Sequence, residues 1–230
     1  MKFDKRKIIE KFPFSLKGFV GIFTAVMFLF IIMPVFMDNF YAFLGYQFCF
    51  VLTILSTIYV LRNSRKILFW GIALVFPYML FVLLGLFQNS LILLAIGYIF
   101  FCIYIAGAIF LLSKEVIEVP FIDTNIIFGV ITIYFLAGIF WGKLYFVVDT
   151  FHPGSFGGII KLNPSDTIQA GYLNQYDLLY YSYTVLTTLG LGDISPIHHL
   201  AKSLTVLEAM FGQLFLATVI AKIVAFWKKE

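Results

Sequence analysis

Six long apolar runs constrain this chain more than any other feature of its sequence. Each holds roughly 20 mostly apolar residues, the length at which an α-helix crosses the hydrocarbon core of a bilayer. The runs lie at residues 18–37, 40–61, 67–87, 90–112, 124–148 and 201–227. A backbone in lipid must satisfy its own hydrogen bonds, so each run is predicted to form a spanning helix. The predicted fold class is an all-α integral membrane protein with six transmembrane helices.

The composition agrees with a membrane protein. Of the 230 residues, 62% are hydrophobic and 12% are charged, whereas soluble domains contain about 45–50% apolar and about 25% charged residues. The net charge is +4, but the basic residues lie mainly at the ends of apolar runs and form no patch with aromatic residues. We therefore expect a lipid bilayer as partner and no nucleic acid.

The placement of lysine and arginine predicts the orientation of the chain, because cytoplasmic loops carry an excess of these residues. They cluster in the N-terminal segment, between the second and third runs, and at the C-terminus, with Lys114 between the fourth and fifth runs. The turns after the first and third runs contain none. We expect a multi-pass protein of the plasma (inner) membrane with both termini cytoplasmic. The segment at 149–200 then faces outside.

The segment at 149–200 differs from the rest of the chain in its glycines, prolines and polar residues. Residues 177–187 are predicted to form a helix of about ten residues, roughly 15 Å long, with Asn174 or Asp177 as its N-cap. The sequence TTLGLGDISP follows, and its proline prevents an immediate return to helix. A helix too short to cross the bilayer, followed by a non-helical strand, predicts a re-entrant pore helix and loop between helices five and six.

Two glycines in this loop, Gly190 and Gly192, alternate with Leu189 and Leu191. Non-helical backbone at membrane depth is tolerated where it is buried in protein or lines a water-filled path. Glycine adopts backbone angles that other residues avoid, so the alternation allows the carbonyls to point to one side and the leucines to pack on the other. Several such strands around an axis would form rings of carbonyl oxygens, which can replace the hydration shell of a cation.

The motif TTLGLGD resembles the selectivity-filter signature of potassium channels, T-x-G-[YFL]-G-D. The flanking sequences DLLYYSYTVLTTLGLGDISP and SLTVLEAMFGQLFLATVIAKIVAFW resemble the pore helix with filter and the inner helix of prokaryotic members. The resemblance covers about residues 124–227, and Leu191 stands where tyrosine or phenylalanine is common. It implies a passive potassium-selective channel rather than an enzyme. Because the chain holds one filter motif and the family needs four, it also implies a homotetramer.

The resemblance assigns the filter residue by residue. The implied selectivity filter comprises Thr187, Thr188, Leu189, Gly190, Leu191, Gly192 and Asp193. K⁺, as the permeant ion and not as a cofactor, is expected at Thr188, Leu189, Gly190 and Leu191, on backbone carbonyls and the Thr188 hydroxyl. The acid that matches Asp193 in the family hydrogen-bonds to the pore helix and braces the filter mouth.

The sixth run supplies the candidates for the inner cavity and gate, which are Glu208, Gly212, Gln213, Leu216, Ile220 and Val224. The last four recur on one helix face and are expected to line the cavity. In the family, a glycine at the position of Gly212 can be a gating hinge, but small residues also permit close helix packing. Acids within the membrane usually face protein or water. For Glu208 we favour a buried contact near the pore helix over a cavity-facing group that attracts cations.

The predicted organisation is a four-helix membrane scaffold at 1–123 and a pore domain at 124–230, with outer helix, pore helix, filter and inner helix. The fourth run contains no arginine, and steep voltage gating needs several charges, so the scaffold is not expected to be a working voltage sensor. No cytoplasmic ligand-binding domain is expected in this chain.

Two alternatives stay open at this point. The first is a non-selective cation channel on the same architecture. The second is a secondary transporter, which is disfavoured because transporters often carry broken helices in both halves of the chain. In this sequence the second half carries the broken segment.

Overall fold

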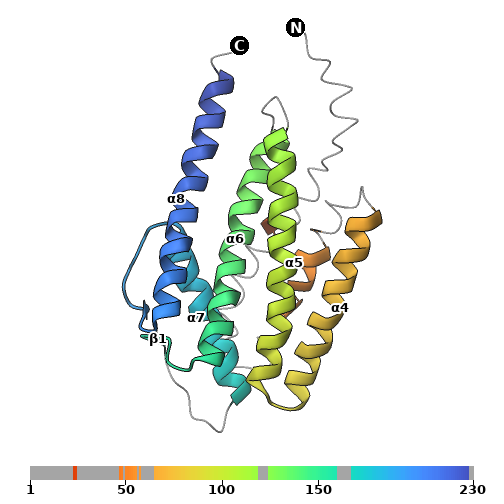
Figure 1. The fold of residues 1–230 in the computed structure, drawn as a ribbon, viewed down its shortest axis with the longest axis vertical. Helices are drawn as coiled ribbons and strands as arrows, with labels where there is room; N and C mark the ends of the chain where they lie inside the picture. The colour runs from red at the N-terminus through yellow and green to blue at the C-terminus, as the bar shows by residue number, and fades with distance from the viewer. Residues whose placement is uncertain are drawn as a thin grey trace.

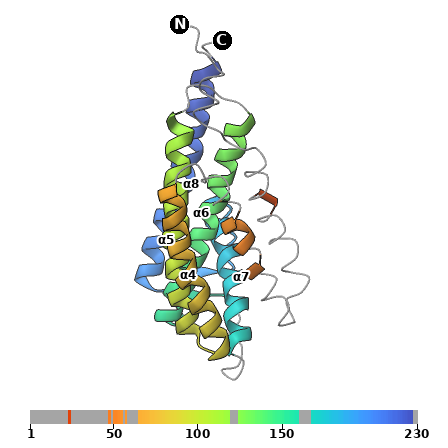
Figure 2. The ribbon, with the colours of Figure 1, turned by 90° about the vertical axis from the view of Figure 1, so that its right-hand side faces the viewer.

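The computed structural model describes residues 23–24, 47–48, 50–55, 57, 65–118, 124–159 and 167–227. The elements within the longer ranges are α4 (Arg65–Phe87), α5 (Leu91–Glu118), α6 (Thr124–Phe151), β1 (Phe156–Gly157), α7 (Thr167–Leu186), β2 (Ser195–Pro196) and α8 (His199–Trp227). Helices α4, α5, α6 and α8 run side by side in an elongated bundle (Figure 1; Figure 2). Successive helices pack against one another, α6 also contacts α8, and α5 also contacts α7.

Four of the described helices are long and apolar enough to cross a membrane. The candidate spans are Phe69–Phe87, Leu91–Lys114, Ile126–Phe151 and His199–Lys222, and they correspond to the third to sixth predicted runs. The first two runs, at 18–37 and 40–61, lie largely outside the described residues. The described part of the chain is therefore a mostly helical membrane protein.

Aromatic side chains fill the space between α4, α5 and α6. Phe101 of α5 packs edge to face against Phe50, and its ring centroid lies 5.2 Å from those of both Phe50 and Tyr78. Tyr98, nearly one turn earlier on α5, packs against Phe146 of α6 at 5.4 Å. All five side chains are buried. Such pairs bury large apolar areas, so they hold these helices together.

Helix α8 is the least covered of the candidate spans. Within the single chain 11% of its apolar window is buried, compared with 50% for α5 and 56% for α6. It contacts α6 and α7, and Phe215 and Lys222 in its second half contact α6 and α5, but most of its surface faces outward. The fold of one chain therefore leaves a long apolar face on α8.

The prediction of a helix limited to 177–187 was wrong about where the helix begins. Helix α7 has 20 residues and begins at Thr167, so Asn174 and Asp177 lie inside it and do not cap its start. Asp166 directly precedes the helix in sequence and is of a type favoured at N-caps. The added turns are polar in sequence, but Gln175 within them is buried against α5 and α6. Tertiary contacts therefore stabilise a helix that apolar patterning did not indicate.

A two-stranded antiparallel sheet supplements the helices. β1 pairs with β2, with Phe156 opposite Pro196 and Gly157 opposite Ser195. The sheet ties the segment after α6 to the segment before α8, at one end of the bundle (Figure 1).

Glycine allows α6 and α7 to approach closely, which gives the first prediction. A Cβ atom added at Gly142 would lie 2.9 Å from the Leu179 Cα atom, whereas one added at Gly107 on α5 would meet no atom within 4 Å. We expect Gly142→Ala to lower the free energy of unfolding by about 1–3 kcal/mol through overpacking. Gly107→Ala should cause no loss, since alanine favours helix. Thermal unfolding of the two variants in detergent checks this, and equal midpoints would contradict the packing.

Candidate functional site

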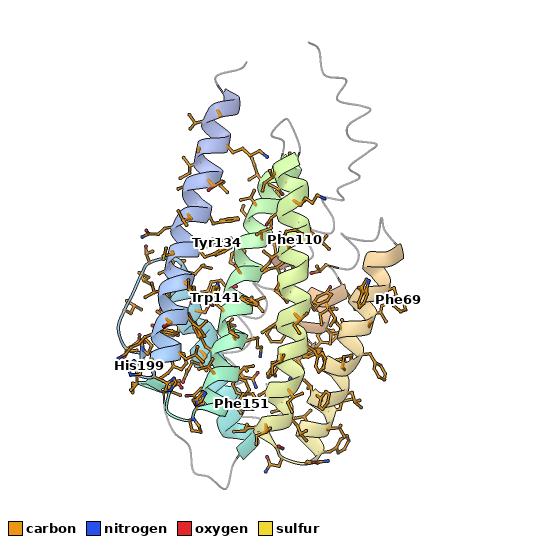
Figure 3. All side chains as sticks on the ribbon, in the orientation of Figure 1. Phe69, Phe110, Tyr134, Trp141, Phe151 and His199 are labelled. Carbon is orange, nitrogen blue, oxygen red and sulfur yellow. The ribbon has the colours of Figure 1, made fainter. Side chains whose placement is uncertain are left out.

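The segment at 187–194 turns the chain back toward the end of the bundle at which α7 begins (Figure 1). At its start, α7 ends against the middle of α8, where a Cβ atom added at Gly212 would lie 2.3 Å from the Leu186 carbonyl oxygen. At its end, β2 leads directly into His199, the first residue of α8. His199 and Phe151, the last residue of α6, lie toward the same end of the molecule (Figure 3). The segment thus runs back about 20 Å along α8.

The backbone of this segment alternates between left-handed and ordinary residues. Thr188, Gly190 and Gly192 have φ values of 61°, 55° and 80°, while Leu189 and Leu191 do not have positive φ. A positive φ is uncommon for a residue other than glycine, and such strained residues concentrate at functional sites. In a regular β-strand successive carbonyls point in opposite directions. Reversal of φ at every second residue allows them to point to one side.

The same segment is open on one side in the single chain. Every residue from 187 to 193 is exposed, and the side chains of Leu189 and Leu191 are 62% and 59% exposed. A Cβ atom added at Gly190 or Gly192 would meet no atom within 4 Å. One chain therefore supports this segment without enclosing it.

The carbonyl groups at the end of α7 hold the start of the segment. The backbone N–H and the hydroxyl of Thr187 both donate to the Tyr183 carbonyl, at 3.0 and 2.7 Å. Thr188 N–H donates to the Val185 carbonyl at 2.9 Å, and Gly190 N–H donates to the Thr184 carbonyl at 3.1 Å. The last carbonyls of a helix lack helical partners, so these bonds fix the segment to the helix end.

Two contacts hold the other end of the segment. The Tyr180 hydroxyl of α7 donates to Asp193 Oδ2 at 2.8 Å. Gly158, at φ 88°, packs so closely that an added Cβ atom would lie 1.9 Å from the Asp193 carbonyl oxygen. Burial, followed by the charge of Asp193, raises the pKa of the Asp177 carboxyl. The end of the segment thus combines a hydrogen-bonded brace with two neighbouring acids.

Helix α7 is in turn held to α6 by hydrogen bonds. The Tyr134 hydroxyl of α6 donates to the Leu186 carbonyl at 2.9 Å, and the Tyr183 hydroxyl donates to the Phe135 carbonyl at 2.6 Å. Tyr134 lies on α6 next to α8 (Figure 3), with its ring stacked 5.7 Å from that of Phe215. These bonds fix the position of the last turn of α7 relative to α6.

A second set of polar contacts joins α7 to the helices farther from the segment. The buried Lys143 ammonium of α6 lies 2.6 Å from Gln175 Oε1 and 3.9 Å from the centroid of the Tyr98 ring. The Tyr98 hydroxyl donates to the same Gln175 oxygen at 2.8 Å and accepts a bond from Gln47. Cation–π and hydrogen-bond contacts of this kind are strong where water is excluded. They connect α5 and α6 to the first half of α7.

The structure places the two α8 residues with open alternatives at packed positions. Glu208 is fully buried, and its carboxyl contacts the Ser182 hydroxyl of α7 at 2.5 Å and the Tyr145 hydroxyl of α6. Gly212 lies against the Leu186 carbonyl. Glu208 thus makes a buried contact with α7, and Gly212 allows α8 to pack closely against the end of α7.

The other four candidates on α8 are exposed in the single chain, and they are Gln213, Leu216, Ile220 and Val224. Because α8 is a continuous helix, their spacing places them on one face. Their role in lining an inner cavity stays a prediction.

Sequence reasoning missed several of the supporting residues. Three of them, Lys143, Gln175 and Tyr134, make hydrogen bonds with partners between 32 and 77 positions away. The fourth, Gly158, packs closely against Asp193. The adjacent glycines Gly157 and Gly158 are a signal in the sequence that could have indicated a close backbone contact.

Comparison with known proteins adds one finding. Residues 121–229 match a family model described as "Ion channel", and this range contains α6, α7, the segment at 187–194 and α8. No curated protein and no solved structure matches the chain. The second half of the chain is therefore similar to ion channels, which supports passive ion conduction by a membrane protein.

The bond between Tyr180 and Asp193 gives the second prediction. Tyr180→Phe removes the hydrogen bond to Asp193 from the end of the segment. Amide hydrogen exchange in a peptide covering 187–194 should become about fivefold faster, since local opening limits exchange. Tyr176→Phe, four positions earlier on α7, is the matched control, because no hydrogen bond of the Tyr176 hydroxyl occurs among the described residues. Equal exchange in the two variants would show that the bond does not brace the segment.

Proposed function

We propose that the protein is a passive potassium-selective channel that conducts through a four-fold filter of backbone carbonyls. The observation that carries the proposal is the alternation of positive φ at Thr188, Gly190 and Gly192 within TTLGLGD. It supplies the backbone pattern that a one-sided row of carbonyls needs. Such carbonyls can replace the hydration shell of a cation.

The proposed ion sites lie on the carbonyls of Thr188, Leu189, Gly190 and Leu191, together with the Thr188 hydroxyl. These are neutral oxygen ligands, which suit a weakly hydrated monovalent cation that must bind and leave quickly. Asp193 and Asp177 lie beside the outer end of this row. Their negative charge would raise the local concentration of cations and repel anions.

The assembly that we propose is a homotetramer. One chain carries one filter segment, which is open on one side, and a largely exposed α8. Four copies around an axis would close the row of carbonyls and bury the faces left open in the single chain. Gln213, Leu216, Ile220 and Val224 would then face the inner cavity below the filter.

The proposed orientation places the filter mouth outside the plasma (inner) membrane, with both termini in the cytoplasm. The turn between α4 and α5 lies at the same end of the bundle as β1 (Figure 1) and contains no lysine or arginine. Lys114 and Lys222 lie near the C-terminal ends of α5 and α8, at the other end of the bundle from this turn. This distribution agrees with the excess of basic residues in cytoplasmic loops.

The scaffold at 1–123 is proposed to support the pore rather than to sense voltage. Helix α5, the last helix of the scaffold, contains no arginine, and Lys114 is near its end. Moving one charge through 100 mV supplies about 2.3 kcal/mol, so steep gating needs several charges in the field. The contacts of Tyr98 and Lys143 with Gln175 would hold α7 from the scaffold side.

The third prediction tests the carbonyl row. Gly190→Ala adds a side chain at φ 55°, where an L-residue is strained by about 1–2 kcal/mol. The added Cβ atom meets no atom of its own chain within 4 Å, so the change acts on the filter backbone and not on the packing of the bundle. We expect K⁺ flux from liposomes to be lost while the tetramer still assembles.

Gly107→Ala is the matched control, because it makes the same substitution at an open position of α5. It should leave K⁺ flux unchanged. Normal flux through the Gly190→Ala protein, with the control also active, would rule out the assigned ion sites.

A further inference from the structure

The buried carboxyl of Glu208 lies at the junction of three helices. Its Oε1 atom is 2.5 Å from Ser182 Oγ of α7, and its Oε2 atom accepts a hydrogen bond from the Tyr145 hydroxyl of α6. Ser182 Oγ is also 2.8 Å from the Gly138 carbonyl oxygen of α6. Glu208, Ser182 and Tyr145 are all fully or almost fully buried.

The number of hydrogens at this junction decides the state of the carboxyl. A serine hydroxyl has one hydrogen to donate, yet Ser182 Oγ lies within hydrogen-bond distance of two acceptors, the Gly138 carbonyl and Glu208 Oε1. With an ionised Glu208, one of these close oxygen pairs would have no hydrogen between its atoms. With a protonated Glu208, the carboxyl donates to Ser182 Oγ, Ser182 donates to Gly138, and Tyr145 donates to Oε2. Every contact then contains one hydrogen.

The surroundings of Glu208 agree with a neutral carboxyl. Among the described residues, the titratable groups that interact with its charge are the hydroxyls of Tyr134 and Tyr145 on α6 and of Tyr181 and Tyr183 on α7. Tyrosines are neutral below a pH of about 10, and no ion pair of Glu208 occurs within the described ranges. An unpaired buried charge is costly.

Lys143 is the basic residue of α6, and its contacts lie at another site. The Lys143 ammonium contacts Gln175 and the Tyr98 ring, on the side of α6 that faces α5. The tyrosine hydroxyls thus form the surroundings of the Glu208 carboxyl in the described structure.

We propose that Glu208 is a positioning residue for the filter and that it works in its protonated form. Its proton completes the hydrogen-bonded junction that joins α8 to α7 and α6. Ser182 lies five positions before Thr187, so this junction sets the position of the helix end that carries the filter. This inference rests on the proposed channel function.

Loss of the proton would disturb the filter at a distance. An ionised carboxylate has no hydrogen for Ser182, and it places a charge among groups that do not neutralise it. Ser182 would then turn its hydrogen from Gly138 toward Glu208, and α7 would lose one of its hydrogen bonds to α6. Ion flux should therefore fall as the pH rises from neutral to alkaline.

The experiment compares the wild type with Glu208→Gln and Glu208→Ala. The glutamine amide can donate to Ser182 Oγ and accept from Tyr145 at every pH, so Glu208→Gln mimics the protonated acid. We expect it to keep the K⁺ flux of the wild type at neutral pH and to lose the fall at alkaline pH. Glu208→Ala removes the junction and should reduce flux about tenfold or more, with a lower thermal midpoint in detergent.

Infrared spectroscopy of the same proteins reads the proton without any ion flux. The carbonyl stretching band of a protonated carboxylic acid should appear in the wild type at neutral pH and be absent from Glu208→Gln. If no protein conducts K⁺ but this band is present and Glu208→Gln is as stable as the wild type, the proposed function fails while the protonated junction stands. Absence of the band, flux or stability of Glu208→Gln as low as that of Glu208→Ala, or identical pH profiles in wild type and Glu208→Gln, would each overturn the inference.

Discussion

The structure depends on one physical constraint, which is that a non-helical backbone among membrane helices must find partners for its polar groups. The segment at 187–194 meets this constraint near its two ends. The carbonyls of the last turn of α7 accept the N–H groups of Thr187, Thr188 and Gly190, and Tyr180 and Gly158 hold Asp193. In the proposed channel, the carbonyls between the two ends would be left for the permeant ion.

The sequence predicted the fold where helix length and apolarity determine it. The third to sixth apolar runs are long apolar helices in the structure, because a continuous apolar run of that length has one stable conformation in a membrane. The start of α7 was missed because its first turns are polar. Their stability comes from Gln175, whose partners Tyr98 and Lys143 are 77 and 32 positions away. Local sequence does not reveal partners at such distances.

The candidate site, like the fold, was predictable where local sequence determines it and not where it depends on distant contacts. The alternation of glycine and leucine indicated an unusual backbone, and positive φ occurs at both glycines and at Thr188. The presence of an acid in an apolar run marked Glu208 for attention, because burial of a carboxyl requires specific partners. Its partners Tyr145 and Ser182 were not predictable, since they depend on how α6, α7 and α8 cross. The same holds for Gly158, which contacts Asp193 across the space between two loops.

Leu191 lies in the proposed potassium filter. Its side chain is 59% exposed in the single chain and has no polar group to anchor it. Potassium selectivity is therefore the property that most needs a direct test. The most direct test is the reversal potential of the purified protein in a planar bilayer, with K⁺ on one side and Na⁺ at equal concentration on the other. A potassium-selective channel should give a reversal potential far from zero, with the sign set by K⁺ permeation. A reversal potential near zero would contradict potassium selectivity and would show a non-selective cation channel built on the same architecture.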